Sequence, residues 1–169
     1  QMCDAVIDRG TLLAIMQAAK KADDSLLRDY AETTVAVADI KIAVRSMKTG
    51  KNKDFMKRAM AECNTLDIDR LATAAVAGME EIERYLADTA YAGGAEALSE
   101  SASAFERWCD NRIIETIKPQ KYNPFTVGPI VAYILARLNE IKTVRIILTC
   151  KLNQLPEEAI RERVREMYV

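Results

Sequence analysis

The sequence predicts an all-α fold made of repeated helical bundle modules. Only six glycines and four prolines interrupt 169 residues, and no stretch alternates apolar and polar residues with the two-residue period of a strand. Apolar residues instead recur three and four positions apart, as on the buried face of a helix. Half of the residues are apolar, so the chain can form a core without disulfides or metals.

One apolar stripe occurs twice along the chain. The first copy consists of Leu26, Tyr30, Thr33, Val37, Ile40, Val44 and Met47. The residues 101 positions later are Val127, Val131, Ile134, Leu138, Ile141, Arg145 and Leu148, and six of these seven are apolar. An offset of 100 after Lys142 aligns Arg45 with Arg145 and makes all seven apolar. The repeat predicts two helical modules, 1–92 and 93–169, between which a helix can be exchanged.

Both stripes are expected to be buried by neighbouring helices. Six or seven buried side chains stabilise a helix by roughly 10–20 kcal/mol. Ordering about 25 residues costs about 1–2 kcal/mol for each residue. An isolated helix is therefore unstable, and each long helix is expected to be the centre of a small bundle.

The first module is expected to hold five helices. Apolar residues share one face of a helix over 11–22. Asp23 or Asp24 can cap the long helix that follows, and Gly50 can end it. Three shorter helices follow, over 53–62, 67–77 and 79–89.

The second module is expected to begin at a hinge, Ala92-Gly93-Gly94-Ala95. A helix over 98–117 contains Ser103 and Glu106 at the spacing of a capping box. Asn123-Pro124 can open the second long helix, unless Gly128-Pro129 delays its start by a turn. Leu155-Pro156 is expected to start the last helix, whose charged residues up to 166 form a solvated surface with pairs such as Glu157 and Arg161.

Composition argues against several functional classes. A formal net charge of −1, from 24 basic and 25 acidic residues, provides no general attraction for nucleic acid. The chain has no histidine, which excludes Ser-His and Cys-His catalytic pairs and imidazole metal sites. The longest uncharged run, Tyr122 to Ala136, is too short to span a membrane. The four cysteines are scattered, as is typical of free thiols in a reducing compartment.

No motif predicts a catalytic, cofactor-binding or metal site. Lys48-Thr49-Gly50-Lys51 lacks the residue order of a phosphate-binding loop and ends a helix, where the dipole repels phosphate. Glu80, Glu81 and Glu83 lack the histidines of a di-iron bundle and indicate a solvated helix face. Phe105, Cys109, Ile113 and Ile117 recur every four residues, which is typical of a core.

Two basic clusters are candidate partner-docking residues. They are Lys41, Arg45 and Lys48 on the first long helix and Lys142, Arg145 and Lys151 on the second. The alternative is an ordinary solvated face balanced by Asp39 and Glu140. Arg145 interrupts an apolar stripe, so its guanidinium is expected to reach a carboxylate or the solvent edge.

Three C-terminal segments resemble a known family. They are Pro129-Ile130-Val131-Ala132-Tyr133-Ile134-Leu135-Ala136, Glu140-Ile141-Lys142-Thr143-Val144-Arg145-Ile146-Ile147-Leu148 and Leu155-Pro156-Glu157-Glu158-Ala159-Ile160-Arg161-Glu162-Arg163. With Lys151, they resemble the C subunit of bacterial and archaeal V-type (A-type) ATPases, which is related to the d subunit of the eukaryotic enzymes. Tyr30 to Arg58 is similar to the preceding part of that family, whereas residues 8–13 match it loosely and Cys150 replaces a more usual glycine.

The resemblance implies an all-helical funnel built around a pseudo-threefold axis. It implies a non-catalytic rotor connector that receives the central shaft of the D and F subunits and sits on the membrane rotor ring. Such a protein has no cofactor and is cytoplasmic, peripheral on the inner face of the membrane through its complex. The complex couples ATP synthesis or hydrolysis to transport of protons or sodium. Because the family is longer at its N-terminus and this chain begins at Gln1, we expect a C-terminal fragment.

Two other functional classes are compatible with the residues. One is a generic helical-repeat scaffold or adaptor unrelated to ATPases. The other is a helical hydrolase or transferase that uses carboxylates, which would need a deep pocket lined by inward-facing acids.

Overall fold

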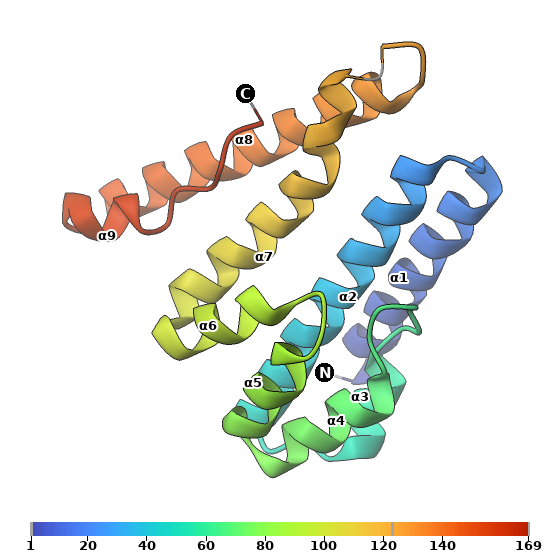
Figure 1. Ribbon diagram of the computed structural model, residues 1–169. Coiled ribbons are helices and arrows are strands. Elements are labelled where there is room, and N and C mark those ends of the chain that lie inside the picture. Colours follow the sequence, from blue (N-terminus) through green and yellow to red (C-terminus); the bar gives the residue numbers. More distant parts are fainter. Residues whose placement is uncertain (1, 123, 169) are drawn as a thin grey trace. The chain divides into compact units, whose positions relative to one another are not determined.

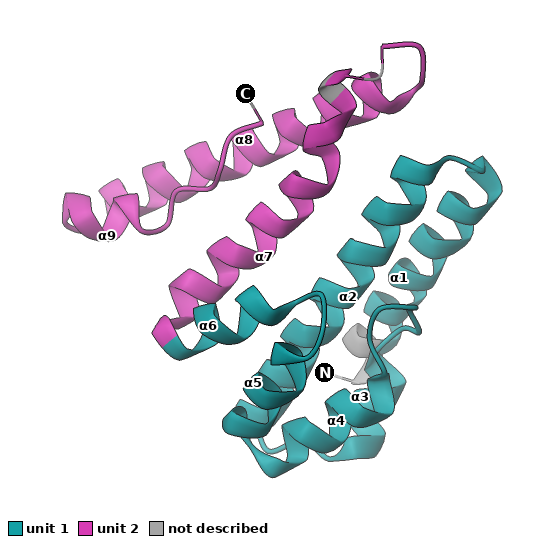
Figure 2. Ribbon diagram, viewed as in Figure 1, with its two compact units in different colours: residues 1–99 teal, residues 100–169 magenta. Residues whose placement is uncertain are grey.

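The structure, a computed structural model, describes residues 2–122 and 124–168, with side chains for 6–120, 122 and 124–168 (Figure 1). All regular elements of these residues are helices, which confirms the all-α prediction. The helices form two compact units, unit 1 at residues 1–99 and unit 2 at 100–169 (Figure 2). Each unit is described below by itself, and the duplication and exchange of modules stay predictions.

Unit 1 is built around its longest helix, α2 (Ser25–Lys48). The other helices are α1 (Met2–Ala22), α3 (Lys53–Ala59), α4 (Ile68–Ala77), α5 (Met79–Ala87) and α6 (Ala92–Glu100). Helices α1, α3, α4 and α5 all contact α2. The first stripe is buried at Leu26, Thr33, Val37, Ile40 and Val44 and half-buried at Tyr30 and Met47. The prediction that this stripe belongs to a central, covered helix is therefore confirmed.

Local signals set the helix ends of unit 1. Asp24 caps α2, since its Oδ1 accepts a hydrogen bond from the backbone N–H of Leu27 at 3.1 Å. Asp67 caps α4 in the same way. Gly50 follows α2 with a φ of +62°, a left-handed conformation that favours glycine. These ends are as expected, whereas α1 begins earlier than predicted and α3 and α5 stop earlier.

A non-helical segment, residues 60–67, is held against α2 by two carboxylates. Glu32 accepts hydrogen bonds from the backbone N–H of Thr65 at 2.7 Å and from its hydroxyl at 2.9 Å. Asp39 Oδ1 accepts one from the backbone N–H of Ala61 at 3.1 Å. Asp39 is fully buried, and its Oδ2 has no hydrogen-bond partner among the described residues. Burial raises the pKa of Asp39 to about 7, although the Ala61 N–H and the charge of Arg9 lower it.

Unit 2 consists of α7 (Ala102–Ile117), the 3-10 helix η1 (Lys118–Tyr122), α8 (Gly128–Leu152), α9 (Glu157–Arg161) and a C-terminal tail. Helix α8 contacts α7, η1 and α9. It begins at Gly128 with proline in its first turn, which confirms the later of the two expected starts. The earlier expected cap, Asn123, lies outside the described residues.

Two local predictions for residues 92–117 are wrong. The expected hinge at Ala92–Ala95 is part of α6, where Gly94 and Ala95 are buried and their small size permits close packing. The expected helix over 98–117 is interrupted at Ser101, whose hydroxyl accepts a hydrogen bond from the N–H of Ala104 at 3.0 Å. Ser101 rather than Ser103 of the capping-box pattern is the cap, because the same side-chain chemistry occurs two residues earlier.

The substitution Asp39→Asn tests the energetic effect of burying this carboxyl. The pKa of Asp39 is higher in the folded state than its ordinary value of 3.8, so the wild type loses stability as the pH rises from about 4 to about 7. We expect the unfolding free energy of the variant, relative to wild type, to increase over this window by on the order of 3 kcal/mol, since one pKa unit corresponds to about 1.4 kcal/mol. Urea unfolding across this pH range measures it, with the exposed Asp54→Asn as control. A difference that is constant with pH would contradict the prediction.

Candidate functional site

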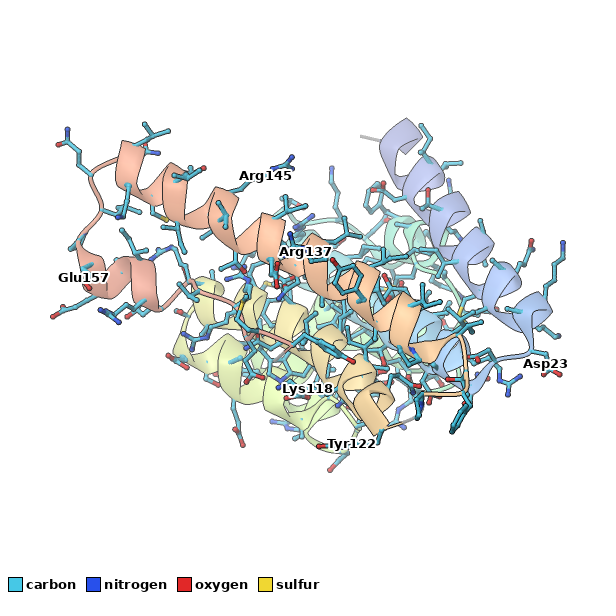
Figure 3. The ribbon with its side chains drawn as sticks, turned by 90° about the horizontal axis from the view of Figure 1, so that it is seen from above. Asp23, Lys118, Tyr122, Arg137, Arg145 and Glu157 are labelled. Carbon is cyan, nitrogen blue, oxygen red and sulfur yellow. The ribbon has the colours of Figure 1, made fainter. Side chains whose placement is uncertain are left out.

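The structure places the six candidate docking residues in two groups. Lys41, Arg45 and Lys48 lie on α2 in unit 1, and Lys142, Arg145 and Lys151 lie on α8 in unit 2. Lys41 is half-buried and the other five are exposed. The exposure of Arg145 at the solvent edge confirms the expectation for its guanidinium, and Figure 3 shows its position on α8. A docking role for the six residues stays a prediction.

One of these residues also has a structural role within unit 2. Lys142 Nζ lies 2.6 Å from Asp110 Oδ1, although half of the lysine side chain is exposed. The other carboxylate oxygen, Asp110 Oδ2, lies 2.6 Å from Nε of Arg165. Asp110 and Arg165 are both buried. The three side chains connect α7, α8 and the C-terminal tail around one carboxylate.

Further hydrogen bonds hold the tail in place. Asn139 Nδ2 of α8 donates to the backbone oxygen of Glu166 at 2.8 Å. Asn111 Oδ1 of α7 accepts from the N–H of Glu166 at 2.9 Å. The prediction that residues 157–166 form a solvated surface is therefore wrong for Arg165, because a carboxylate distant in sequence compensates its burial. It is correct for the exposed pair of Glu157 and Arg161, joined at 3.1 Å.

The prediction that the second stripe is buried is also wrong. Helix α8 buries the opposite side, which carries small or polar residues: Gly128, Ala132, Ala136, Asn139, Thr143 and Cys150. Small side chains let α8 approach its neighbours closely, and the polar Asn139 binds the tail. Half-buried Leu135, Ile146 and Ile147 lie beside the buried side, so apolar residues nearly surround α8 and hydrophobic spacing alone could not decide which side is buried.

The consequence is a row of large apolar side chains in contact with solvent, here named the α8 face. Its members are Ile130, Tyr133, Ile134, Leu138, Ile141, Val144, Leu148 and Leu152, which are between 47% and 84% exposed. Scattered exposed apolar residues are common, but a contiguous row on one helix marks an interaction site. The α8 face is the candidate functional site. The repeat included four of its residues, Ile134, Leu138, Ile141 and Leu148, but did not indicate that they are exposed.

A groove between α4 and α5 is the strongest alternative site. Its volume is about 510 Å³, and its lining includes Asp69, Glu81 and Asp88. Asp69 lies 3.3 Å from Lys53 and 3.0 Å from Lys57. The hydrogen bonds from Lys57 and Lys53 lower the pKa of Asp69, so it is a stably ionised surface carboxylate and a poor proton donor. Asp69 therefore does not suit general-acid chemistry.

Two further observations concern metal and thiol chemistry among the described residues. No group of three or more cysteine, aspartate or glutamate side chains among them is arranged to hold a metal ion. Cys63 and Cys150 are free thiols, and burial raises the pKa of Cys63 to about 11, so Cys63 is a weak nucleophile. Among the described helices, none combines the length and the apolar composition needed to cross a membrane.

Comparisons with known proteins point to one family. The model of the ATP synthase (C/AC39) subunit family matches residues 1–163. The C subunit of the A-type ATP synthase of Methanocaldococcus jannaschii is 27% identical over 148 residues, which cover 82% of this chain and 37% of the relative. The chain thus spans well under half of the length of that relative. No solved structure matches the chain.

The substitution Asp110→Asn is expected to destabilise the chain by about 3 kcal/mol, because it leaves the buried charge of Arg165 without its carboxylate. Glu115→Gln on the same helix is the matched control. Its exposed carboxylate lies 3.4 Å from Arg112, and we expect its loss to change stability by less than about 0.5 kcal/mol. Urea unfolding measures both variants. Equal stability of Asp110→Asn and wild type would show that the ion pairs do not hold unit 2 together.

Proposed function

Because the chain belongs to the ATP synthase (C/AC39) subunit family over residues 1–163, we propose that it acts as a rotor connector. In this role it is a non-catalytic component of the central stalk of an A-type or V-type ion-translocating ATPase. It joins the central shaft, formed by the D and F subunits, to the membrane rotor ring.

The observation that carries this proposal is the exposed α8 face. Eight large apolar side chains in contact with solvent on one helix are costly for an isolated protein and are explained by assembly with another surface. A protein that connects two parts of a complex needs such a surface. The basic residues Arg145 and Lys151 beside it favour a partner with acidic groups.

The chemistry of the described residues supports a mechanical role. The carboxylates of the α4–α5 groove include an ion-paired Asp69, and the reactivity of Cys63 is low. Torque would pass from one partner to the other through packed helices. Helix α8 suits this task because it is 25 residues long and is tied to α7 and the tail through Asp110.

The wider assembly follows from the same proposal. The protein is cytoplasmic and is held at the inner face of the membrane through its complex. In this proposal residues 1–92 and 93–169 are repeated modules of a pseudo-threefold protein, and the six basic residues contribute to docking. Family membership does not fit a scaffold unrelated to ATPases.

Co-purification tests the proposed function. The full-length parent protein is co-expressed with the D and F subunits and with the ring protein, and its complexes are isolated. We expect the wild type to retain shaft and ring. A parent protein that binds neither would refute the rotor role.

Variants of the α8 face test whether this surface makes the contact. Leu138→Glu combined with Ile141→Glu should reduce recovery of a partner at least tenfold, because charges then occupy an apolar contact. The unfolding free energy should change by less than about 0.5 kcal/mol for each of these exposed sites. Val76→Glu on α4, which replaces another exposed apolar side chain, is the matched control and should retain both partners. Full recovery with the α8 variant would exclude the α8 face as the contact.

A further inference from the structure

The exposed side of α8 has the periodicity of a coiled-coil seam. Ile134, Leu138, Ile141, Arg145, Leu148 and Leu152 are spaced alternately four and three residues apart, and all six are exposed. This spacing is that of the a and d positions of a heptad, with Leu138, Arg145 and Leu152 at a. We call these six residues the α8 seam. The residues buried in unit 2 include Ala136, Thr143 and Cys150, which fall at position f, opposite the seam.

The charged residues beside the seam are all basic. Positions e and g border the seam and face the flanking residues of a partner helix. On α8 their charged members are Arg137 and Lys151 at g and Lys142 at e. The sole acidic residue of this helix, Glu140, lies at position c, away from the border, where it forms an ion pair with Arg137. Figure 3 shows Arg137 and Arg145 along α8.

We propose that the α8 seam docks a helix of another protein of the complex, one that carries an apolar heptad stripe flanked by acidic e and g residues. This inference rests on the proposed function, since it gives the chemistry of the partner that α8 receives. The seam would form a two-helix coiled coil on the surface of unit 2.

The flanking charges disfavour a second copy of this chain as the partner. In a parallel pair, Arg145 would meet Arg145 at the centre. Arg137 at g would also face Lys142 at e of the other copy, although Glu140 and Asp110 already pair with these two groups. In an antiparallel pair, g faces g and e faces e, which again places basic groups opposite each other. Like charges at these positions act against self-pairing, whereas glutamate or aspartate there would be attracted.

The residues that flank the seam determine which partner it selects. Covering the exposed halves of five isoleucine and leucine side chains stabilises a complex by an amount comparable to the cost of association. Apolar burial alone therefore yields weak, unspecific binding. The charge match at e and g selects the partner and strengthens the complex.

Two designed peptides test this inference. Both are four-heptad helices with leucine and isoleucine at a and d, and they differ only in having glutamate or lysine at e and g. Fluorescence anisotropy measures their binding to the 169-residue chain. We expect the glutamate peptide to bind at least tenfold more tightly than the lysine peptide, and added salt to reduce this preference.

Reversal of the flanking charges provides the decisive comparison. Arg137→Glu combined with Lys151→Glu should reverse the preference in favour of the lysine peptide, and the neutral pair Arg137→Gln with Lys151→Gln should abolish it. Lys20→Glu combined with Lys21→Glu, two exposed basic residues at the end of α1, is the matched control and should leave the preference unchanged. Circular dichroism confirms that each variant is folded.

Several results would overturn the inference. In the peptide assay they are binding of neither peptide, equal binding of both peptides, or a preference that the charge reversal does not change. A stable dimer of the chain in sedimentation would also overturn it, as would tighter binding of anionic vesicles than of the glutamate peptide.

Failure of this inference is distinguishable from failure of the rotor role. If the parent protein retains shaft and ring but the chain does not prefer the glutamate peptide, only the proposal of the α8 seam is overturned. If the chain prefers the glutamate peptide but the parent protein binds neither shaft nor ring, only the rotor role is overturned.

Discussion

The arrangement of unit 2 depends on one carboxylate, Asp110. Its two oxygens bind Lys142 of α8 and Arg165 of the tail, each at 2.6 Å. Because α8 has apolar residues all round, hydrophobic burial alone would allow more than one rotation of this helix about its axis. The ion pair with Lys142 and the hydrogen bond from Asn139 to the tail are both made in the rotation in which small residues face inward, and they stabilise it. The large apolar residues are then exposed.

This rotation of α8 explains why two similar apolar stripes differ in exposure. In unit 1 the chain continues after α2 into α3, α4 and α5, and these helices cover α2. In unit 2 the contacts of α8 with α7, η1 and α9 leave the large apolar residues of α8 exposed. The same helical pattern is therefore part of a core in one unit and an open surface in the other. A rotor connector uses such a surface for assembly, in keeping with the proposed function.

The sequence predicts local structure well and long-range partners poorly. The all-α class, the cap at Asp24 and the stop at Gly50 follow from short-range chemistry, and the structure has them. The sequence indicates part of the candidate site. The spacing from Ile134 to Leu148 identifies its stripe residues, but their exposure depends on the ion pair of Asp110 and Arg165, which are 55 positions apart. No local pattern indicates this ion pair, because a buried arginine within a charged segment has the same sequence pattern as a solvent-exposed arginine.

We infer that the α8 face is open in the isolated chain and covered in the assembled rotor. Site-resolved thiol labelling of Leu138→Cys measures this coverage, with Val76→Cys as the reference position. We expect rapid labelling of both cysteines in the isolated chain and at least tenfold slower labelling of Leu138→Cys alone in the complex with shaft and ring. Equal labelling of Leu138→Cys in both states, or slow labelling in the isolated chain, would show that the α8 face is not the contact.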